Sequence, residues 1–577
     1  MRKSLSKLSV WVMIFVIIQW CMCFVSFAGN GTANENAAVA IEAITNVGLI
    51  EGDSSGITDS YLNKTTKRYQ LAILFLRLNG LENEAINYTS AVNDNFSDAK
   101  LLSPQNQAIL LYLKHNPDLG WAKGKKFEPL KEVTTEDLYK VLLQALEYEA
   151  GVDFDENNVI EFANSIGITH LTESKKVTNK DVILSLYQAL KLNVKGTEMN
   201  LATKLAKMNI ISANSARESG FVILPPGYKI VGYIPAWKEW DASKIMGDKL
   251  THLNLAFAAI KDGVIDNGKD INDKHFNELK KLKEKYPHLK ILISVGGWGA
   301  DGFSDAALTE ESRNKFADSV VEYLRVHNLD GIDVDWEYPV NGGWGTIKAR
   351  PEDKVNFTLL MRTLREKLDK AGQEDNKYYI LSFAASINPS YYKEWTEFDK
   401  VVEIADFVNV MEYDVHGPWD KVTGHLSALE LSDKDNTGIC GSSSIKGMLE
   451  AGASPDKLVY GFPFYGYYWT DVEKNNNGLY QKVNGNSGEV SYEEILAKYN
   501  EENGFKRYWD EKAKAAYLWN EEKGIFVTYE DPEAIAEEIA FIAKNNLGGA
   551  MFWEYTHDFS GTLLNTIVES LWTAGEE

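Results

Sequence analysis

The chain has 577 residues, a length typical of two or three domains rather than one. It carries 83 Asp and Glu residues against 60 Lys and Arg residues, which gives a formal net charge of -23. This surplus of negative charge argues against nucleic acid or an anionic membrane as a partner held by bulk electrostatics. Aromatic residues make up 12% of the chain, which fits both large cores and rings that stack on sugar faces.

Residues 1–28 have the features of a secretory signal peptide. Arg2, Lys3 and Lys7 give a positive start, residues 8–27 are apolar, and small residues end the run. The alternative is an uncleaved membrane anchor, because the apolar run is long for a signal peptide. We therefore expect a secreted protein.

Two of the three cysteines, Cys21 and Cys23, lie in this first segment. Only Cys440 remains after cleavage, so the mature chain cannot form an internal disulfide. An exported protein without disulfides is more typical of a bacterium than of a eukaryotic secretory pathway. The sequence has no Cys/His cluster with metal-ligand spacing, and we expect no metal.

A polar linker is expected at 29–40, followed by a helical region at 41–200 in which one unit occurs three times. Each unit has a Thr, predicted to be a helix N-cap, followed by an amphipathic helix rich in leucine. The three copies are Thr66–Leu78, Thr134–Leu146 and Thr178–Leu190.

This region resembles three S-layer homology repeats, which hold bacterial exoproteins on cell-wall polysaccharide. Such repeats carry a basic residue after the Thr that starts the helix, and that position is Lys67, Thr135 and Asn179 here. The resemblance implies a bacterial cell-wall polymer as a partner. The alternative is a small helical domain that only spaces or supports the rest of the chain.

After a linker-like stretch at 213–228, strands and helices alternate. The strand candidates are 229–234, 251–258, 289–295, 331–336, 379–385, 407–411, 458–462 and 549–553. Eight strands with helices between them predict an α/β fold, a (β/α)8 TIM barrel over 227–575. Residues 467–530, between the seventh and eighth strands, predict an inserted α+β subdomain.

The fourth predicted strand carries a row of acids: Asp333, Asp335 and Glu337 alternate with apolar residues, and Asp330 precedes them. Side chains two residues apart on a strand share one face, so the three acids should repel one another and hold different pKa values. A solvated acidic edge and a hard-cation site are the alternatives. The apolar neighbours argue against the first, and the absence of a cation-binding loop spacing argues against the second.

This run resembles the Asp-x-x-Asp-x-Asp-x-Glu signature of family 18 glycoside hydrolases, the chitinase family. Four other strand ends match the family as well: Ser294-Val-Gly-Gly-Trp298, Met411-Glu-Tyr-Asp414, Met551-Phe-Trp553 and Gly232-Tyr-Ile-Pro-Ala-Trp237. One position departs from the pattern, because many relatives have Arg where this chain has Tyr467.

The resemblance implies acid catalysis in which the substrate supplies the nucleophile. Glu337 would be the acid, Asp335 would hold the acetamido N–H, Asp333 would share a proton with Asp335, and Tyr413 would donate to the acetamido oxygen. The substrate-binding residues implied are Trp237, Phe257, Gly297, Trp298, Tyr338, Met411, Asp414, Tyr465 and Trp553. No metal or organic cofactor is needed.

We therefore expect a secreted, retaining chitinase that acts on β-1,4-linked N-acetylglucosamine polymers, without a nucleic-acid partner and as a monomer. One alternative is an endo-β-N-acetylglucosaminidase acting on peptidoglycan or N-glycans. The other is a chitin-binding, lectin-like barrel, against which the presence of Glu337 argues.

Overall fold

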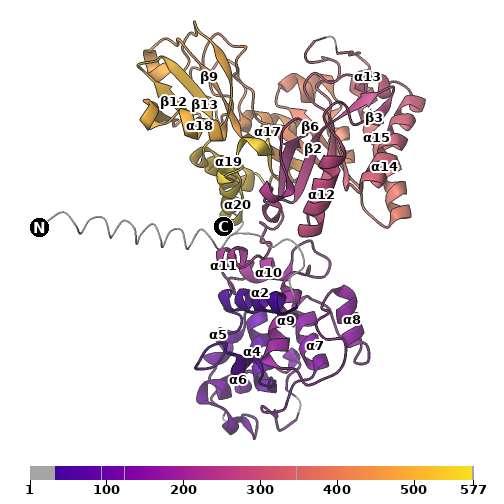
Figure 1. The fold of residues 1–577 in the computed structure, drawn as a ribbon, viewed down its shortest axis with the longest axis vertical. Helices are drawn as coiled ribbons and strands as arrows, with labels where there is room; N and C mark the ends of the chain where they lie inside the picture. The colour runs from indigo at the N-terminus through magenta and orange to yellow at the C-terminus, as the bar shows by residue number, and fades with distance from the viewer. Residues whose placement is uncertain (1–32, 93, 123, 346, 575–577) are drawn as a thin grey trace, which may run out of the picture. The chain divides into compact units, whose positions relative to one another are not determined.

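The computed structural model describes residues 33–92, 94–122, 124–345 and 347–574. The expected signal peptide, with Cys21 and Cys23, lies outside these ranges. The chain forms two compact units, which divide between Ile223 and Leu224. Figure 1 shows the first unit as indigo and magenta helices and the second as a barrel with a separate small sheet. Within the described residues, no helix combines the length and hydropathy needed to cross a membrane.

The first unit is built from helices joined by loops. Its helices are α2 (Ala33–Asn46), α3 (Asp59–Leu62), α4 (Arg68–Leu78), α5 (Glu82–Ile86), α6 (Pro104–His115), α7 (Thr135–Ala145), α8 (Val159–Ile166), α9 (Asn179–Leu190), α10 (Leu201–Lys207) and α11 (Ala213–Glu218). The expected linker at 29–40 is wrong from residue 33 on, because α2 begins there. The helices also continue past the expected end at residue 200.

The three repeats meet in a closed ring of backbone hydrogen bonds just before α4, α7 and α9. The Thr66 amide donates to the Val177 carbonyl, the Val177 amide to the Val133 carbonyl, and the Val133 amide back to the Thr66 carbonyl, at 2.9–3.1 Å. A ring of this kind places three extended segments around one axis. Thr66, Val133 and Val177 are therefore equivalent positions in the three copies.

This equivalence corrects the expected alignment of the repeats by one residue in the first copy. Thr134 and Thr178 are N-caps as predicted, but the cap of α4 is Lys67, whose amide donates to the Gln70 side chain at 2.8 Å. The expected cap, Thr66, instead donates from its hydroxyl to Asn179 at 2.8 Å. The basic residue that follows the cap is thus Arg68 rather than Lys67.

The second unit confirms the predicted TIM barrel. Eight parallel strands pair in the order β1-β14-β8-β7-β6-β5-β4-β2, and β2 pairs with β1 to close the ring. Their bounds are β1 Lys229–Pro235, β2 His252–Lys261, β4 Lys290–Gly296, β5 Gly331–Asp335, β6 Ile380–Ser386, β7 Phe407–Met411, β8 Leu458–Pro463 and β14 Gly549–Trp553. The short strand β3 (Val264–Asp266) forms a hairpin with β2.

Helices cover the outside of the barrel: α12 (Asp273–Lys285), α13 (Phe303–Ala306), α14 (Glu310–His327), α15 (Asp353–Asp375), α16 (Phe398–Ile404), α17 (Gly441–Glu450), α19 (Pro532–Lys544) and α20 (Thr562–Ala574). Strand residues such as Ile293, Val334 and Phe383 pack outward against these helices. Residues that alternate with them, such as Leu292 and Met551, fill the inside of the barrel.

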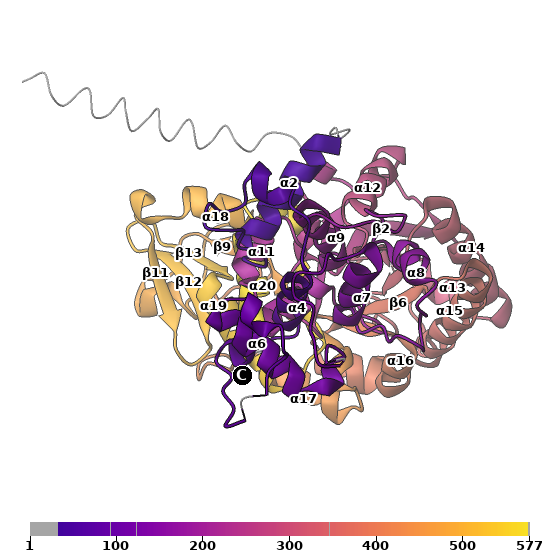
Figure 2. The same cartoon turned by 90° about the horizontal axis from the view of Figure 1, so that it is seen from below.

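The insertion forms an antiparallel sheet of five strands in the order β10-β9-β13-β12-β11, next to helix α18 (Tyr492–Lys498). The strands are β9 Tyr465–Trp469, β10 Ser487–Ser491, β11 Lys506–Asp510, β12 Ala515–Asn520 and β13 Ile525–Tyr529. β9, β12, β13 and α18 lie together in both views (Figures 1 and 2). The loop after β7 packs on this subdomain, where the Leu426 amide donates to the Thr528 hydroxyl at 2.9 Å.

Candidate active site

The predicted row of acids lies at the carboxyl end of β5, the fourth strand of the barrel. Asp333 and Asp335 are on the strand and point inward, whereas Glu337 lies two residues beyond its last residue. The expected strand 331–336 is therefore one residue too long, and Glu337 stands on the loop that leaves β5. Carboxyl ends of barrel strands form the face on which TIM-barrel enzymes carry their chemistry.

Asp333 is fully buried and accepts four side-chain hydrogen bonds. Tyr233 and Ser294 donate to Oδ2, both at 2.7 Å, and Ser382 and Asn409 donate to Oδ1 at 2.7 and 3.1 Å. Burial raises the pKa of Asp333, although these four donors act in the opposite direction. The expected sharing of a proton between Asp333 and Asp335 stays a prediction.

Asp335 contrasts with Asp333. It is 4% exposed, and its Oδ1 has no hydrogen-bond partner among the described residues. Burial raises its pKa well above the ordinary value, and the carboxyls of Glu337 and Asp333 raise it further. A buried acceptor without a donor costs free energy, so Asp335 is prepared to accept a hydrogen bond from an incoming N–H group.

Glu337 is half-buried and has the pKa of a general acid at neutral pH. Burial raises this pKa to about 7, and the negative charge of Asp414 adds to the shift. A carboxylic acid with a pKa near the working pH is partly protonated, and it can take up a new proton after it has donated one. Glu337 is thus the carboxyl of the row that is best suited to donate a proton.

Two glycines of the Ser-Val-Gly-Gly-Trp motif let the backbone of β4 approach the acidic strand. A Cβ atom on Gly296, whose φ is +115°, would overlap the backbone carbonyl of Asp335. A Cβ atom on Gly297, whose φ is +87°, would stand 2.6 Å from the ring of Phe257. The Gly297 amide also donates to the Asp335 carbonyl at 2.9 Å. The motif therefore fixes the backbone of Asp335 and the position of Phe257.

Four residues, two from the segment that follows β7 and two from β9, complete one wall of the site. Tyr413 is buried close to the acids. Burial raises the pKa of Tyr413 well above its ordinary value, and the negative charges of the acids raise it further. Asp414 accepts hydrogen bonds at Oδ1 from Tyr465 at 2.7 Å and from Tyr467 at 2.8 Å. Tyr467 therefore binds the site carboxylate through a neutral hydroxyl.

Aromatic rings form a flat surface beside the acids. The ring of Trp553 stacks on Phe257 at 5.4 Å, and Trp237 lies 6.1 Å from both. Half-buried Met411 packs in the same apolar cluster as Phe257 and Trp553. Trp298 is 60% exposed and lies edge-on to Tyr338 at 6.2 Å. Flat, partly exposed rings of this kind suit the apolar faces of sugar rings.

Sequence reasoning missed the donors that surround Asp333. Ser294 and Ser382 lie directly across from Asp333 on the two neighbouring strands, and Tyr233 and Asn409 reach it from other strands. A polar residue inside an otherwise apolar strand, such as Ser294 in Lys-Ile-Leu-Ile-Ser-Val-Gly, is the signal that could have identified them. Two exposed rings, Trp344 (69%) and Trp419 (60%), were also missed.

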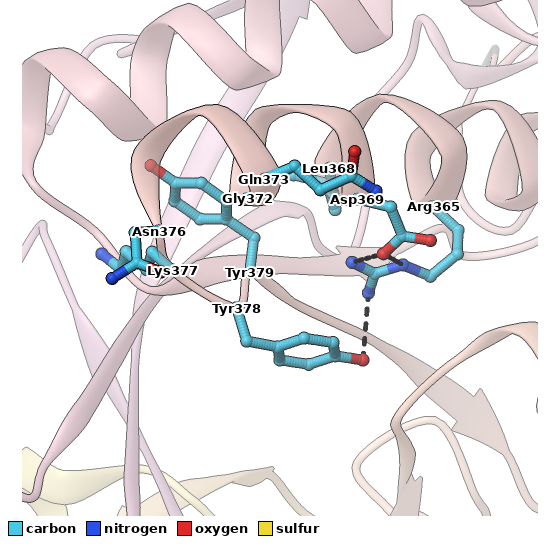
Figure 3. A pocket seen from close by; sticks show the side chains of 9 residues that line it. All are labelled: Arg365, Leu368, Asp369, Gly372, Gln373, Asn376, Lys377, Tyr378 and Tyr379. Carbon is cyan, nitrogen blue, oxygen red and sulfur yellow. Dashed lines mark hydrogen bonds and ion pairs between the residues drawn. The ribbon is translucent and has the colours of Figure 1, made fainter.

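A separate pocket lies away from these acids, between the end of α15 and the start of β6 (Figure 3). Strand starts and strand ends lie at opposite ends of a parallel barrel, so this pocket is not part of the candidate site. Its charged groups pair with each other, as Arg365 does with Asp369 at 2.6 Å. In the parts of the chain that are described, no group of three or more His, Cys, Asp and Glu side chains could hold a metal ion.

Comparison with models of protein families shows to which family this barrel belongs. The model for glycosyl hydrolases family 18 matches residues 229–558, which is more than half of the chain. The chain belongs to this family. The predicted family is thereby confirmed, and the match covers all eight strands of the barrel and the acidic row.

In the first unit, residues 124–207 match the family model for the N-terminal region of X-Prolyl dipeptidyl aminopeptidase PepX. This match covers a small part of the chain and includes the second and third repeats but not the first. The resemblance to S-layer homology repeats stays a prediction.

Relatives of this family 18 chain include Chitinase A1 of Niallia circulans, which is 36% identical over 435 residues. That alignment covers 64% of this chain and 62% of the relative, so the chain spans less than two thirds of that protein. A solved family 18 N-acetylglucosaminidase from Paenibacillus barengoltzii is 38% identical, with a TM-score of 0.55, and covers 59% of this chain and 99% of that one.

Chitinase ChiW from Paenibacillus sp. str. FPU-7 is also similar, with 39% identity and a TM-score of 0.58. The likeness covers 60% of this chain and 33% of that one, which is a bacterial cell-surface-expressed multi-modular enzyme.

Proposed function

We propose that this chain is a retaining chitinase, which hydrolyses β-1,4-linked N-acetylglucosamine polymers with the help of the substrate's own acetamido group. One observation carries the proposal: a carboxyl with a pKa of about 7, Glu337, stands beside Asp335, a buried acid with an acceptor oxygen that lacks a donor. Glu337 can supply a proton, and Asp335 can accept a hydrogen bond from the acetamido N–H of the substrate.

In the first step, Glu337 donates its proton to the glycosidic oxygen, and the bond between this oxygen and the anomeric carbon breaks. The acetamido carbonyl oxygen of the same sugar forms a bond to the anomeric carbon from the opposite face. The positive charge then spreads over the acetamido group. Asp335 accepts a hydrogen bond from the acetamido N–H and stabilises this positive charge. The Tyr413 hydroxyl donates a hydrogen bond to the acetamido oxygen and so orients it.

In the second step, a water molecule attacks the anomeric carbon from the side that the leaving group has vacated. Glu337, now a carboxylate, takes a proton from this water, and the bond between the carbonyl oxygen and the anomeric carbon breaks. Two inversions give net retention, and Glu337 ends protonated as it began. Asp333, held by its four side-chain donors, keeps its position throughout.

A second substrate class is an N-acetylglucosamine linkage in a non-chitin glycan, as in an endo-β-N-acetylglucosaminidase acting on peptidoglycan or N-glycans. The 38% identity with the N-acetylglucosaminidase from P. barengoltzii keeps this alternative open. The exposed rings Trp237, Trp298, Trp344 and Trp419 favour chitin, because several stacking surfaces suit a linear polymer. The test is to compare products from chitin oligomers, purified cell wall and N-glycan side by side. Cleavage of the cell wall or N-glycan alone would contradict the chitinase proposal.

We also propose that the protein is exported and that its first unit binds a bacterial cell-wall polymer. Support comes from the signal-like start of the sequence and from Arg68, the basic residue after the first cap. The guanidinium of Arg68 lies 5.6 Å from the ring of Trp121 and 5.0 Å from the ring of Phe127. An arginine over aromatic rings suits an anionic sugar, because its positive charge attracts the anion and the rings stack on sugar faces.

The wall proposal predicts that the full chain pellets with purified bacterial walls at low salt and is released at high salt. Arg68→Ala should weaken this binding. Lys140→Ala is the matched control, because Lys140 is a basic residue on α7 that pairs with Glu156. Failure to pellet at low salt would contradict wall binding and leave the hydrolase proposal intact.

A further inference from the structure

The loop that follows β7 carries an exposed aromatic ring beside the candidate site. Trp419 is 60% exposed, and its ring lies edge-on to the ring of Tyr467 at 5.6 Å. The Tyr467 hydroxyl in turn donates to Asp414 at 2.8 Å. Trp419 therefore stands one ring away from a carboxylate of the site, and it is held there by a loop rather than by a strand.

A tight turn over residues 417–420 fixes this ring. The Asp420 amide donates to the Gly417 carbonyl at 2.9 Å, and the Gly417 amide donates to Oδ2 of Asp420 at 3.0 Å. A Cβ atom on Gly417 would stand 2.3 Å from the Trp419 ring, so the ring packs directly on the backbone of the turn. The position of Trp419 thus depends on this turn, which the carboxylate of Asp420 helps to close.

His416 joins the Trp419 turn to a second segment of the same loop. Its Nδ1 lies 3.3 Å from Oδ2 of Asp420, and its Nε2 lies 3.2 Å from Oδ2 of Asp435. Asp435 is itself held, because the amide and the hydroxyl of Thr437 donate to its Oδ1 at 2.8 and 2.6 Å. The His416 side chain is 12% exposed, and a Cβ atom on Gly424 would stand 2.3 Å from its ring. The ring is therefore a closely packed link between the two segments.

Two carboxylates on one imidazole favour the charged form of the ring. A neutral imidazole has one N–H donor and one acceptor nitrogen, so one of the two carboxylates would face a lone pair, whereas an imidazolium donates from both nitrogens. Burial lowers the pKa of His416, but the hydrogen bonds and charges of Asp435 and Asp420 outweigh burial and raise it above the ordinary value. From the segment before β10, the ring of Tyr480 faces His416 edge-on at 6.4 Å.

We propose that His416, as an imidazolium, is a positioning residue that holds the Trp419 turn beside the site and so prepares Trp419 to stack on a sugar of the bound polymer. The inference rests on the proposed function and adds a residue that governs how tightly the substrate is held. A ring that is fixed before the substrate binds lowers the entropic cost of binding. Because the Ser487 hydroxyl also donates to the Pro418 carbonyl at 3.1 Å, loss of the link should weaken binding rather than abolish it.

The first test measures kcat and KM of the full chain on the N-acetylglucosamine hexamer. His416→Gln should raise KM roughly two- to tenfold, because Trp419 is no longer fixed in advance. It should change kcat little, since Glu337 and Asp335 lie on and after β5, outside this loop. An unchanged KM would overturn the inference, and so would a fall in kcat alone, which is the result expected from partial unfolding.

A double substitution shows whether His416 acts through the tryptophan. Trp419→Ala should raise KM by itself, and adding His416→Gln to it should raise KM no further, because there is no ring left to position. Independent effects, in which the two increases in KM multiply, would overturn the inference.

Asp435→Asn tests the charge of His416 while keeping its ring. Loss of this carboxylate should lower the pKa of His416, so KM should begin to rise at a lower pH than in the parent chain. Asp433→Asn is the matched control, because it removes the same charge from a side chain that is 80% exposed, and it should leave the pH dependence of KM unchanged. A parental pH dependence in Asp435→Asn would overturn the inference. If the unmodified chain does not cleave the hexamer, the proposed function itself fails, which is a distinct result.

Discussion

The hydroxyl of Tyr233 donates a 2.7 Å hydrogen bond to Oδ2 of Asp333 and so joins the first strand of the barrel to the fourth. Asn409, on β7, donates both to this hydroxyl at 3.0 Å and to Asp333 at 3.1 Å. A buried carboxylate thereby holds several strands together at the level of the catalytic row. The carboxylate is stabilised only while its donors are present.

Tyr233→Phe should destabilise the barrel, because it removes one of four donors from a fully buried carboxylate. We expect a loss of roughly 1.5–3 kcal/mol in the free energy of unfolding. Chemical denaturation followed by tryptophan fluorescence would measure it. Tyr378→Phe, at a ring that is 61% exposed, is the control and should have a smaller effect. Equal stability of Tyr233→Phe and the parent chain would contradict the importance of this contact.

The rate of hydrolysis should fall as the pH rises through about 7, because Glu337 must hold a proton to act and its pKa is about 7. The negative charge of Asp414 contributes to this raised pKa, after burial. Asp414→Asn should therefore lower the pKa of Glu337 and move the alkaline limb of the kcat profile to lower pH. The measurement is kcat against pH for both proteins. A shift to higher pH would show that Asp414 does not act on Glu337 through its charge.

Hydrolysis should require an acetyl group on the sugar at the reacting position. The acetamido oxygen is the proposed nucleophile, and neither cellulose oligomers nor fully deacetylated chitosan has one. Reducing-end assays on these two substrates and on chitin oligomers would measure the difference. Comparable rates on all three would rule out substrate assistance.

A second set of buried acids should make the protein less stable at alkaline pH. Burial raises the pKa of Glu538 on α19 from 4.5 to about 8, although the Tyr460 hydroxyl donates to it at 2.9 Å. Glu412 and Glu530 nearby are also buried, with raised pKa values. Because the folded state retains the proton of Glu538 and the unfolded state releases it, this group's contribution to stability falls between pH 4.5 and about 8.

The slope for one such group is about 1.4 kcal/mol per pH unit within this window. Glu538→Gln keeps the shape without the ionisable proton, so its melting temperature should depend less on pH than that of the parent. Glu537→Gln, at a half-exposed neighbouring position, is the control. Identical pH dependence in Glu538→Gln and the parent would contradict the proposed titration.

The barrel could be predicted from the sequence because its strands are short apolar runs that end in polar motifs. The strands predicted at 407–411 and 549–553 coincide with β7 and β14, and most of the others differ by a residue or two at their ends. The ends are uncertain because the last residues of a strand depend on neighbours from other strands. Glu337 shows this, since the alternation of acids continues past the point where β5 stops.

The surroundings of Asp333 could not be predicted in the same way. Ser294, Ser382 and Asn409 gain their role only when three separate strands come into register around one carboxylate. The alignment of the first repeat failed for a related reason, because Lys67 occupies a cap position where the other copies have Thr. Only the ring of backbone hydrogen bonds through Thr66 reveals the equivalence.

The most direct test of the proposed mechanism is the effect of Glu337→Gln on a chitin oligomer. Glutamine keeps the shape of the side chain but has no acidic proton to donate. We predict that hydrolysis falls at least about 10²-fold, while binding of the oligomer, measured by calorimetry, is retained. Hydrolysis within a few-fold of the parent would contradict the assignment of Glu337 as the acid, and with it the mechanism proposed for this site.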